Sequence, residues 1–97
     1  MNFILHPEAE NDLREAAEFY RQRAGSRLSR ALIEEFEHTI NLLLQHPKLG
    51  TPWRHDTRML VLKRFPYSVI YREVSDQIVV VAVAHPSRRP GYWSGRK

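Results

Sequence analysis

The segment from Phe65 to Trp93 places the strongest constraint on the fold of this 97-residue chain. Two runs rich in Val, Ile and Tyr, at 67–74 and 78–84, flank a short polar link, and this composition is typical of paired strands. The second run ends at His85-Pro86, because proline has no amide hydrogen to donate to a strand ladder. The pattern predicts a C-terminal β-hairpin that carries a histidine and a basic, aromatic segment to one end of a sheet.

Two helices are predicted before this hairpin. Proline at position 7, followed by Glu8 and Glu10, is typical of a helix start, and small or apolar residues then recur every three or four positions up to Ala24. A second amphipathic run extends from Ser26, which we expect to cap it, to His46, which precedes a proline. Because so short a link joins the helices, we expect an antiparallel helical hairpin.

Shorter elements complete the predicted chain. Residues 2–5 are a short strand candidate, and residues 47–56 are predicted to be a loop, in which Trp53 is interpreted as a cover for the core edge rather than a contact residue. The run RMLVLKR at 58–64 predicts a strand, antiparallel to the one that follows, with Arg58, Leu60, Leu62 and Arg64 on one face.

These elements predict one α+β domain over residues 1–97, in the order β-α-α-β-β-β. We expect an antiparallel sheet packed on the N-terminal helical hairpin. The strand at 78–84 is the most continuously apolar, so it is placed at the centre. The helices cover one face of the sheet, and the other face is expected to stay partly open, with side chains of 58–64 and 67–71 pointing into it.

Charge is unevenly distributed along the chain. The net charge is +4, but residues 1–52 carry six Lys/Arg and eight Asp/Glu, whereas residues 53–97 carry nine and three. A basic C-terminal half favours an acidic or polyanionic partner, and a solvated basic face is an equally good interpretation.

Several kinds of site are not expected. The chain has no cysteine, which excludes disulfides and thiolate metal sites, and its five histidines show no metal-ligand spacing. No nucleotide or cofactor motif is present, so we expect no metal and no cofactor. No apolar run approaches the roughly 20 residues that span a bilayer, so we expect a soluble, cytoplasmic protein with no membrane partner.

The residues after the last strand suggest possible chemistry. His85 is followed within eight residues by Arg88, Arg89, Tyr92 and Trp93. A histidine can act as acid or base near neutral pH, arginine can stabilise charge on a phosphate, and aromatic rings can stack on bases. RNA carries its own nucleophile in the 2′-hydroxyl, so such a set could cleave RNA without metal. A structural role for His85 is an equally good interpretation.

Four stretches, taken with the element order, resemble the RelE/ParE superfamily of toxins from bacterial type II toxin–antitoxin modules. They are the opening HPEAENDLREAAEFY, the loop HPKLGTPW, the strand FPYSVIYR and the ending AHPSRRPGYW. The resemblance implies a small basic growth inhibitor, neutralised by a cognate antitoxin protein that alone contacts operator DNA.

The resemblance implies one of two activities. ParE-like members, often labelled plasmid stabilisation proteins, inhibit DNA gyrase, and the opening and the H-x-x-R-x-P-x-Y-W ending are closer to this branch. RelE-like members are metal-independent endoribonucleases that cut ribosome-bound mRNA, and for that activity His85, Arg88 and Tyr92 are the expected catalytic residues. An inactive protein retained for its partner is a third interpretation. The residues expected to bind target or antitoxin are Arg58, Lys63, Arg64, Tyr67, Tyr71, Arg89 and Trp93.

Overall fold

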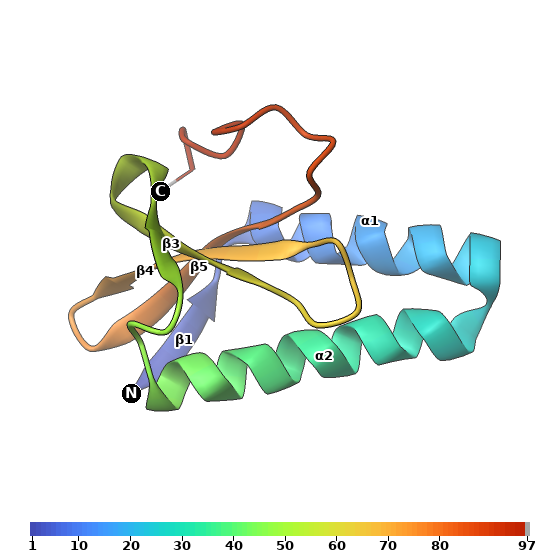
Figure 1. The fold of residues 1–97 in the computed structure, drawn as a ribbon, viewed down its shortest axis with the longest axis horizontal. Helices are drawn as coiled ribbons and strands as arrows, with labels where there is room; N and C mark the ends of the chain where they lie inside the picture. The colour runs from blue at the N-terminus through green and yellow to red at the C-terminus, as the bar shows by residue number, and fades with distance from the viewer. Residues whose placement is uncertain (97) are drawn as a thin grey trace.

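A computed structural model describes residues 1–96 and shows a helical hairpin packed on one face of a sheet (Figure 1). The predicted α+β class and the order β-α-α-β-β-β are confirmed, with one additional short strand. The elements are β1 (Asn2–Leu5), α1 (Pro7–Ala24), α2 (Ser26–Gln45), β2 (Thr51–Trp53), the 3-10 turn η1 (Arg54–Asp56), β3 (Thr57–Val61), β4 (Ser68–Val74) and β5 (Gln77–Ala84). Neither helix is long and apolar enough to cross a membrane, as judged over these residues.

The five strands lie in the order β1-β5-β4-β3-β2. The prediction of a purely antiparallel sheet is wrong for one pair, because β1 runs parallel to β5, whereas the other neighbours are antiparallel. The helical hairpin between β1 and the later strands brings the chain back to the same edge, which permits the parallel pairing. The central position belongs to β4, and β5 is beside it in the interior of the sheet.

The two helices meet at Gly25, which ends α1 and precedes α2. Its φ of 91° lies in the left-handed region that glycine adopts without steric cost. The prediction that Ser26 caps α2 is wrong: Gly25 occupies the N-cap position, no side chain caps the helix, and Ser26 already belongs to the first turn. A serine cap would need a linking residue between α1 and Ser26 in addition to Gly25, but Gly25 alone joins the two helices.

The predicted loop at 47–56 contains the edge strand β2 and the turn η1. Proline at 52 conceals this strand in the sequence, although proline is tolerated on an edge where its missing N–H faces away from the ladder. Trp53 belongs to neither core cluster and is 38 % exposed, so its interpretation as a core cover is wrong. The strand predicted at 58–64 ends at Val61, and residues 62–67 make the connection to β4.

A register shift between Ile70 and Tyr71 pairs Ile70 with Ala82 and Tyr71 with Val80, so Val81 is the extra residue of a β-bulge. Val80 and Val83 then face the helices, whereas Val81 and Ala82 face the opposite side. The bulge therefore gives β5 apolar side chains for two separate cores.

The second core overturns the expectation of an open sheet face. Trp93, only 2 % exposed, packs against Ile70, Val81 and Ala82 on the side away from the helices. The C-terminal segment, residues 85–96, thus folds back over this face (Figure 1). Burying this indole is favourable because large aromatic side chains remove much apolar surface from water.

Candidate binding surface on the C-terminal segment

His85 stands where β5 ends and the C-terminal segment begins. Its Nδ1 accepts the amide hydrogen of Ser87 at 3.0 Å and lies 2.8 Å from the Ser87 hydroxyl. Since Nδ1 is an acceptor, the neutral ring carries its proton on Nε2. The ring also packs edge-to-face on Tyr67, with centroids 5.1 Å apart. Both contacts hold the imidazole in place at the rim of the sheet.

Tyr92 is enclosed by charged groups. Its hydroxyl donates to Asp12 Oδ2 at 3.2 Å, and the guanidiniums of Arg88 and Arg96 lie 4.0 and 5.1 Å from its ring centroid. Burial, together with the Asp12 carboxylate, raises the pKa of Tyr92 to about 12. The phenol therefore stays protonated at neutral pH and acts as a hydrogen-bond donor.

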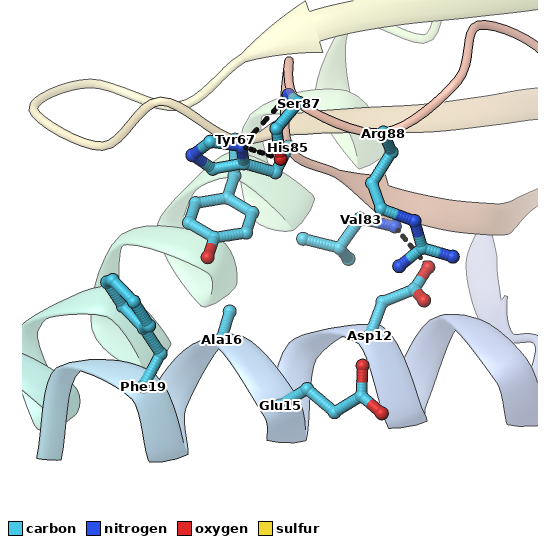
Figure 2. A pocket seen from close by; sticks show the side chains of 9 residues that line it. All are labelled: Asp12, Glu15, Ala16, Phe19, Tyr67, Val83, His85, Ser87 and Arg88. Atoms are coloured by element: carbon cyan, nitrogen blue, oxygen red, sulfur yellow. Dashed lines mark hydrogen bonds between the residues drawn. The ribbon is translucent and has the colours of Figure 1, made fainter. Parts of the chain in front are cut away.

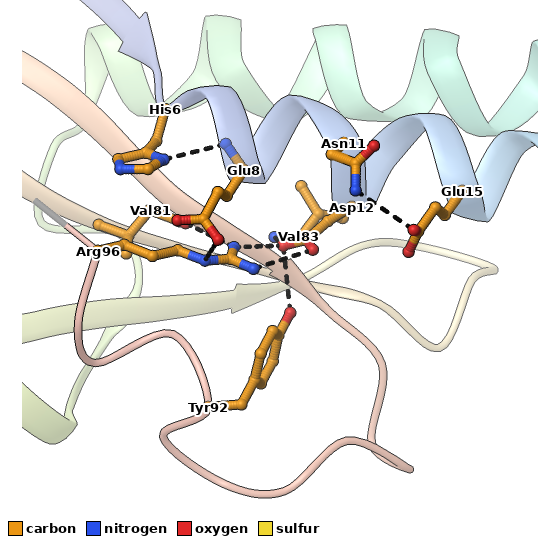
Figure 3. A network of polar contacts seen from close by, with 9 residues as sticks. All are labelled: His6, Glu8, Asn11, Asp12, Glu15, Val81, Val83, Tyr92 and Arg96. Carbon is orange, nitrogen blue, oxygen red and sulfur yellow. Dashed lines mark hydrogen bonds and ion pairs between the residues drawn. The ribbon is translucent and has the colours of Figure 1, made fainter.

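The carboxylate of Asp12 anchors the whole segment to α1 (Figure 3). Arg96 donates to both carboxylate oxygens, from Nη1 at 2.7 Å and from Nη2 at 3.2 Å, and the same carboxylate accepts the amide hydrogen of Val83 at 3.1 Å. The side chains of Asp12 and Arg96 are only 5 % and 10 % exposed. Buried charges of this kind need such complete pairing, because an unpaired one costs several kcal/mol.

This pair also completes the edge of β5 beyond the end of β1. Arg96 Nη1 donates to the Val81 carbonyl at 3.0 Å, and Asp12 accepts from the Val83 amide. The last register pair of β1 with β5 is Leu5 with Val80. Two side chains thus satisfy backbone groups that a neighbouring strand would otherwise satisfy.

Sequence reasoning missed Asp12 and Arg96. Asp12 lies three residues after Ala9 and four before Ala16, both buried, so it falls on the apolar stripe of α1. An acid on an otherwise apolar helix face signals a buried, paired charge. That signal was present in the sequence, but nothing local pointed to Arg96 as the partner.

A first pocket of about 290 Å³ opens between α1 and the start of the C-terminal segment (Figure 2). Its walls come from α1, from the end of β5 and from the segment itself, with His85 and Tyr67 at one side and Arg88 above Asp12. The lining residues are Asp12, Glu15, Ala16, Phe19, Tyr67, Val83, His85, Ser87 and Arg88.

A second pocket of about 400 Å³ lies between β3, β4 and the C-terminal segment. Its floor is apolar and includes Met59, Ile70 and Ala84, and Arg88 and Arg89 stand on its rim. His85 and Arg88 line both pockets, and Tyr92 lines the second. The structure thus brings His85, Arg88 and Tyr92 to one region, as the sequence predicted, but it ties Tyr92 to the protein's own carboxylate.

Comparison with protein families decides the identity of this fold. The chain matches the family described as "ParE toxin of type II toxin-antitoxin system, parDE" over residues 3–90. The chain belongs to the ParE toxin family. A solved structure titled "Chromosomal ParDE TA system from P. aeruginosa" is similar with a TM-score of 0.80 and 20 % sequence identity, covering 88 % of this chain and 95 % of that chain. A search among curated protein sequences found no significant match.

The family match of this ParE toxin ends at residue 90, before Tyr92 and Arg96. The anchor that Asp12 makes to the C-terminal segment therefore rests on this chain's own geometry. The likeness to the ParDE structure, at 20 % identity, establishes the fold alone.

The basic residues predicted to bind partners of the toxin fall into two groups. Arg58 is half-buried and donates to the carbonyls of Gly50 and Lys48 at 2.8 and 3.3 Å, so it supports the chain before β2. Lys63, Arg64 and Arg89 are exposed. Only Arg89 of these three lines a pocket described above.

The predicted aromatic contact residues of the toxin are largely internal. Tyr71 is fully buried on the helix side, where its hydroxyl donates to the Pro47 carbonyl at 2.8 Å and accepts from the Gly50 amide at 2.9 Å. Burial raises the pKa of Tyr71. Tyr67 is also buried against the helix-side core, and Trp93 fills the second core. The expectation that Tyr67 and Tyr71 point into an open face is wrong, because both side chains face the helices.

No group of three or more His, Asp or Glu side chains suited to a metal ion occurs among residues 1–96 of the toxin. The candidate binding surface on the C-terminal segment consists of two pockets that share His85 and Arg88.

Proposed function

We propose that this ParE toxin stops growth by binding DNA gyrase, without chemistry of its own, and that a cognate antitoxin neutralises it in the cytoplasm. The C-terminal segment and the second pocket form the proposed contact surface for gyrase. The engagement of Tyr92 by Asp12 is the observation that carries this proposal.

General acid–base cleavage of RNA needs two groups that exchange protons near neutral pH. Tyr92 has a pKa of about 12, and its hydroxyl already donates to a carboxylate, so it is poorly suited to protonate a leaving group. The Arg88 guanidinium lies over the Tyr92 ring and makes a cation–π contact with the aromatic face. These contacts support a binding surface rather than a catalytic one.

The second pocket supports recognition of a protein. Its apolar floor suits a buried anchor side chain, and exposed arginines on the rim suit acidic residues around it. The antitoxin is expected to be acidic or amphipathic where it meets the basic half of the toxin, because opposite charges steer association.

A supercoiling assay with purified gyrase and relaxed plasmid tests the proposal. The toxin should block supercoiling, and Arg89→Glu should weaken the block at least tenfold by placing an acid on the rim of the second pocket. Arg14→Glu, an equal change of charge on α1, should leave the block within about twofold of wild type. In a translating lysate, the same toxin should leave mRNA intact.

Cut mRNA in that lysate, abolished by His85→Ala, would overturn the gyrase proposal in favour of the RelE-like endoribonuclease. His85 and Arg88 lie together at both pockets, so they are the residues that such an activity would use. Normal growth after induction without the antitoxin would contradict both activities.

A further inference from the structure

The link between α1 and α2 carries an isolated group of arginines. Residues 19–33, named here the hairpin tip, contain Arg21, Arg23, Arg27 and Arg30 and no Asp or Glu. All four arginines are exposed. The net negative charge of residues 1–52 hides this group, because the acids of α1 and α2 lie outside the tip.

Most of these guanidiniums have no acidic partner. Arg21 pairs with Glu18, and the guanidinium of Arg23 lies 4.6 Å from the Phe19 ring centroid. Within residues 1–96, no carboxylate oxygen lies within 4.0 Å of Arg23, Arg27 or Arg30. Three positive charges therefore face solvent around one turn of the chain.

Two of the arginines stand where helix electrostatics disfavour them. In α1 the first turn carries Glu8 and Glu10 and the last turn carries Arg21 and Arg23, which matches the helix dipole. The first turn of α2 has no acid and includes Arg27, and Arg30 follows one turn later, so cations lie near the positive end of that dipole. An anion bound beside them would relieve this repulsion.

The position of the tip suits contact with a large partner. Figure 1 shows the α1–α2 link projecting beyond the sheet at one end of the molecule. At ~1.5 Å per residue, the 20 residues of α2 place the tip roughly 30 Å from the other end of that helix. None of the four tip arginines lines either pocket, although Phe19, the first residue of the tip, lines the first one.

We propose that the hairpin tip binds the phosphate backbone of double-stranded DNA without reading its sequence. Planar guanidiniums bind phosphate oxygens through paired hydrogen bonds, and such contacts give affinity but no base discrimination. The choice of DNA as the polyanion rests on the proposed function, because gyrase acts on DNA. The phosphate contact itself rests on the charge and geometry of the tip.

Fluorescence anisotropy with a labelled 20-base-pair duplex and the full-length toxin, without gyrase, tests this proposal. Wild-type toxin should bind at ~50 mM salt, with log K falling against log salt at a slope of about −3 to −4 if the four arginines engage phosphates. Arg27→Glu with Arg30→Glu should weaken binding at least tenfold and reduce the magnitude of the slope by about 2. Arg14→Glu with Lys48→Glu, the same change of charge outside the tip, should weaken binding no more than about threefold.

The stability of the variant separates lost binding from lost folding. Acids at the start of α2 suit its dipole, so the double tip variant should melt at the same temperature as wild type or higher. The neutral pair Arg27→Gln with Arg30→Gln should fold equally well and bind weakly. Absent binding by wild type, or equal losses in the tip and control variants, would overturn the proposal.

Two competitors decide which polyanion the tip recognises. Unlabelled duplex DNA should displace the probe, whereas a poly-glutamate peptide of equal charge should not. Equal competition by the peptide, or tighter binding of an RNA duplex, would overturn the assignment to DNA. Because gyrase is absent from these measurements, a negative result would leave the supercoiling test of the proposed function unaffected.

Discussion

Asp12 on α1 and Arg96 in the C-terminal segment form a two-bonded ion pair, at 2.7 and 3.2 Å, although they are 84 residues apart in the chain. The carboxylate also holds the Val83 amide and the Tyr92 hydroxyl. One buried acid therefore fixes the position of the segment that carries the proposed contact surface.

Replacing Asp12 with Asn should lower the free energy of unfolding by about 3 kcal/mol, because the Arg96 guanidinium would lose its buried charge partner. Urea denaturation measures the loss. Glu10→Gln, which removes one partner of the exposed Arg14–Glu10 pair, should shift the midpoint much less. Equal shifts in the two variants would show that the Asp12 pair is not a structural anchor. A double-mutant cycle with Arg96→Met should give a coupling of about 1–3 kcal/mol.

Tyr71→Phe should destabilise the fold by about 1–3 kcal/mol, because the Pro47 carbonyl and the Gly50 amide would lose a buried partner. Tyr67→Phe is the matched control, since the Tyr67 hydroxyl makes no hydrogen bond to residues 1–96. Thermal melting compares the two variants. An unchanged melting temperature for Tyr71→Phe would contradict its structural role. Gly50 closes this contact tightly, since an added Cβ there would lie 2.8 Å from the Tyr71 hydroxyl.

Stability should fall at alkaline pH because of Tyr92. Its pKa is raised from 10.0 to about 12 in the folded protein, so its contribution is complete below pH 10 and is lost as the pH rises toward 12. Tyr92 is only partly buried, and solvent screening reduces the effect to about 1 kcal/mol. Denaturation at pH 8 and pH 11 measures the slope. Tyr92→Phe should reduce this loss of stability with rising pH. Part of the loss should remain in the variant, because burial also raises the pKa of Tyr67 and of Tyr71.

Arg58 and Arg64 should respond differently to charge reversal. Arg58→Glu should lower stability, because it removes the hydrogen bonds to the Gly50 and Lys48 carbonyls. Arg64→Glu should leave the melting temperature unchanged and weaken the complex with an acidic antitoxin more at low salt than at high salt. Calorimetric titration at two salt concentrations measures the difference. Equal weakening at both concentrations would exclude a steering role for Arg64.

The sequence predicted the helices and the last three strands because their signals are local. The helices follow from apolar spacing between Pro7 and Gln45, and the β4–β5 hairpin follows from two Val- and Ile-rich runs. The turn between them is tighter than expected: Val74 pairs with Gln77, and Ser75 and Asp76 both have positive φ. Side-chain alternation in β3 was also predicted correctly, since Leu60 faces the helices and Met59 the second core.

The features that the sequence did not predict depend on contacts between distant residues. The parallel pairing of β1 with β5 joins Asn2 to Gln77, and no local pattern specifies it. The covered sheet face depends on Trp93 reaching Ile70 and Val81, and the candidate surface depends on the pair of Asp12 with Arg96. His85, Arg88 and Tyr92 were placed together correctly because they are neighbours in sequence. The hydrogen bond that engages Tyr92 could not be foreseen from that neighbourhood.

The parallel pairing of β1 with β5 has a consequence for synthesis on the ribosome. The first strand finds its partner only when residues 77–80 have been made, and Asp12 finds its partner only when residue 96 has been made. A nascent chain can therefore form the helical hairpin early but must leave that hairpin's apolar face uncovered until the later strands have been made. The toxin should therefore acquire the anchored form of its C-terminal segment only after residue 96 has left the ribosome.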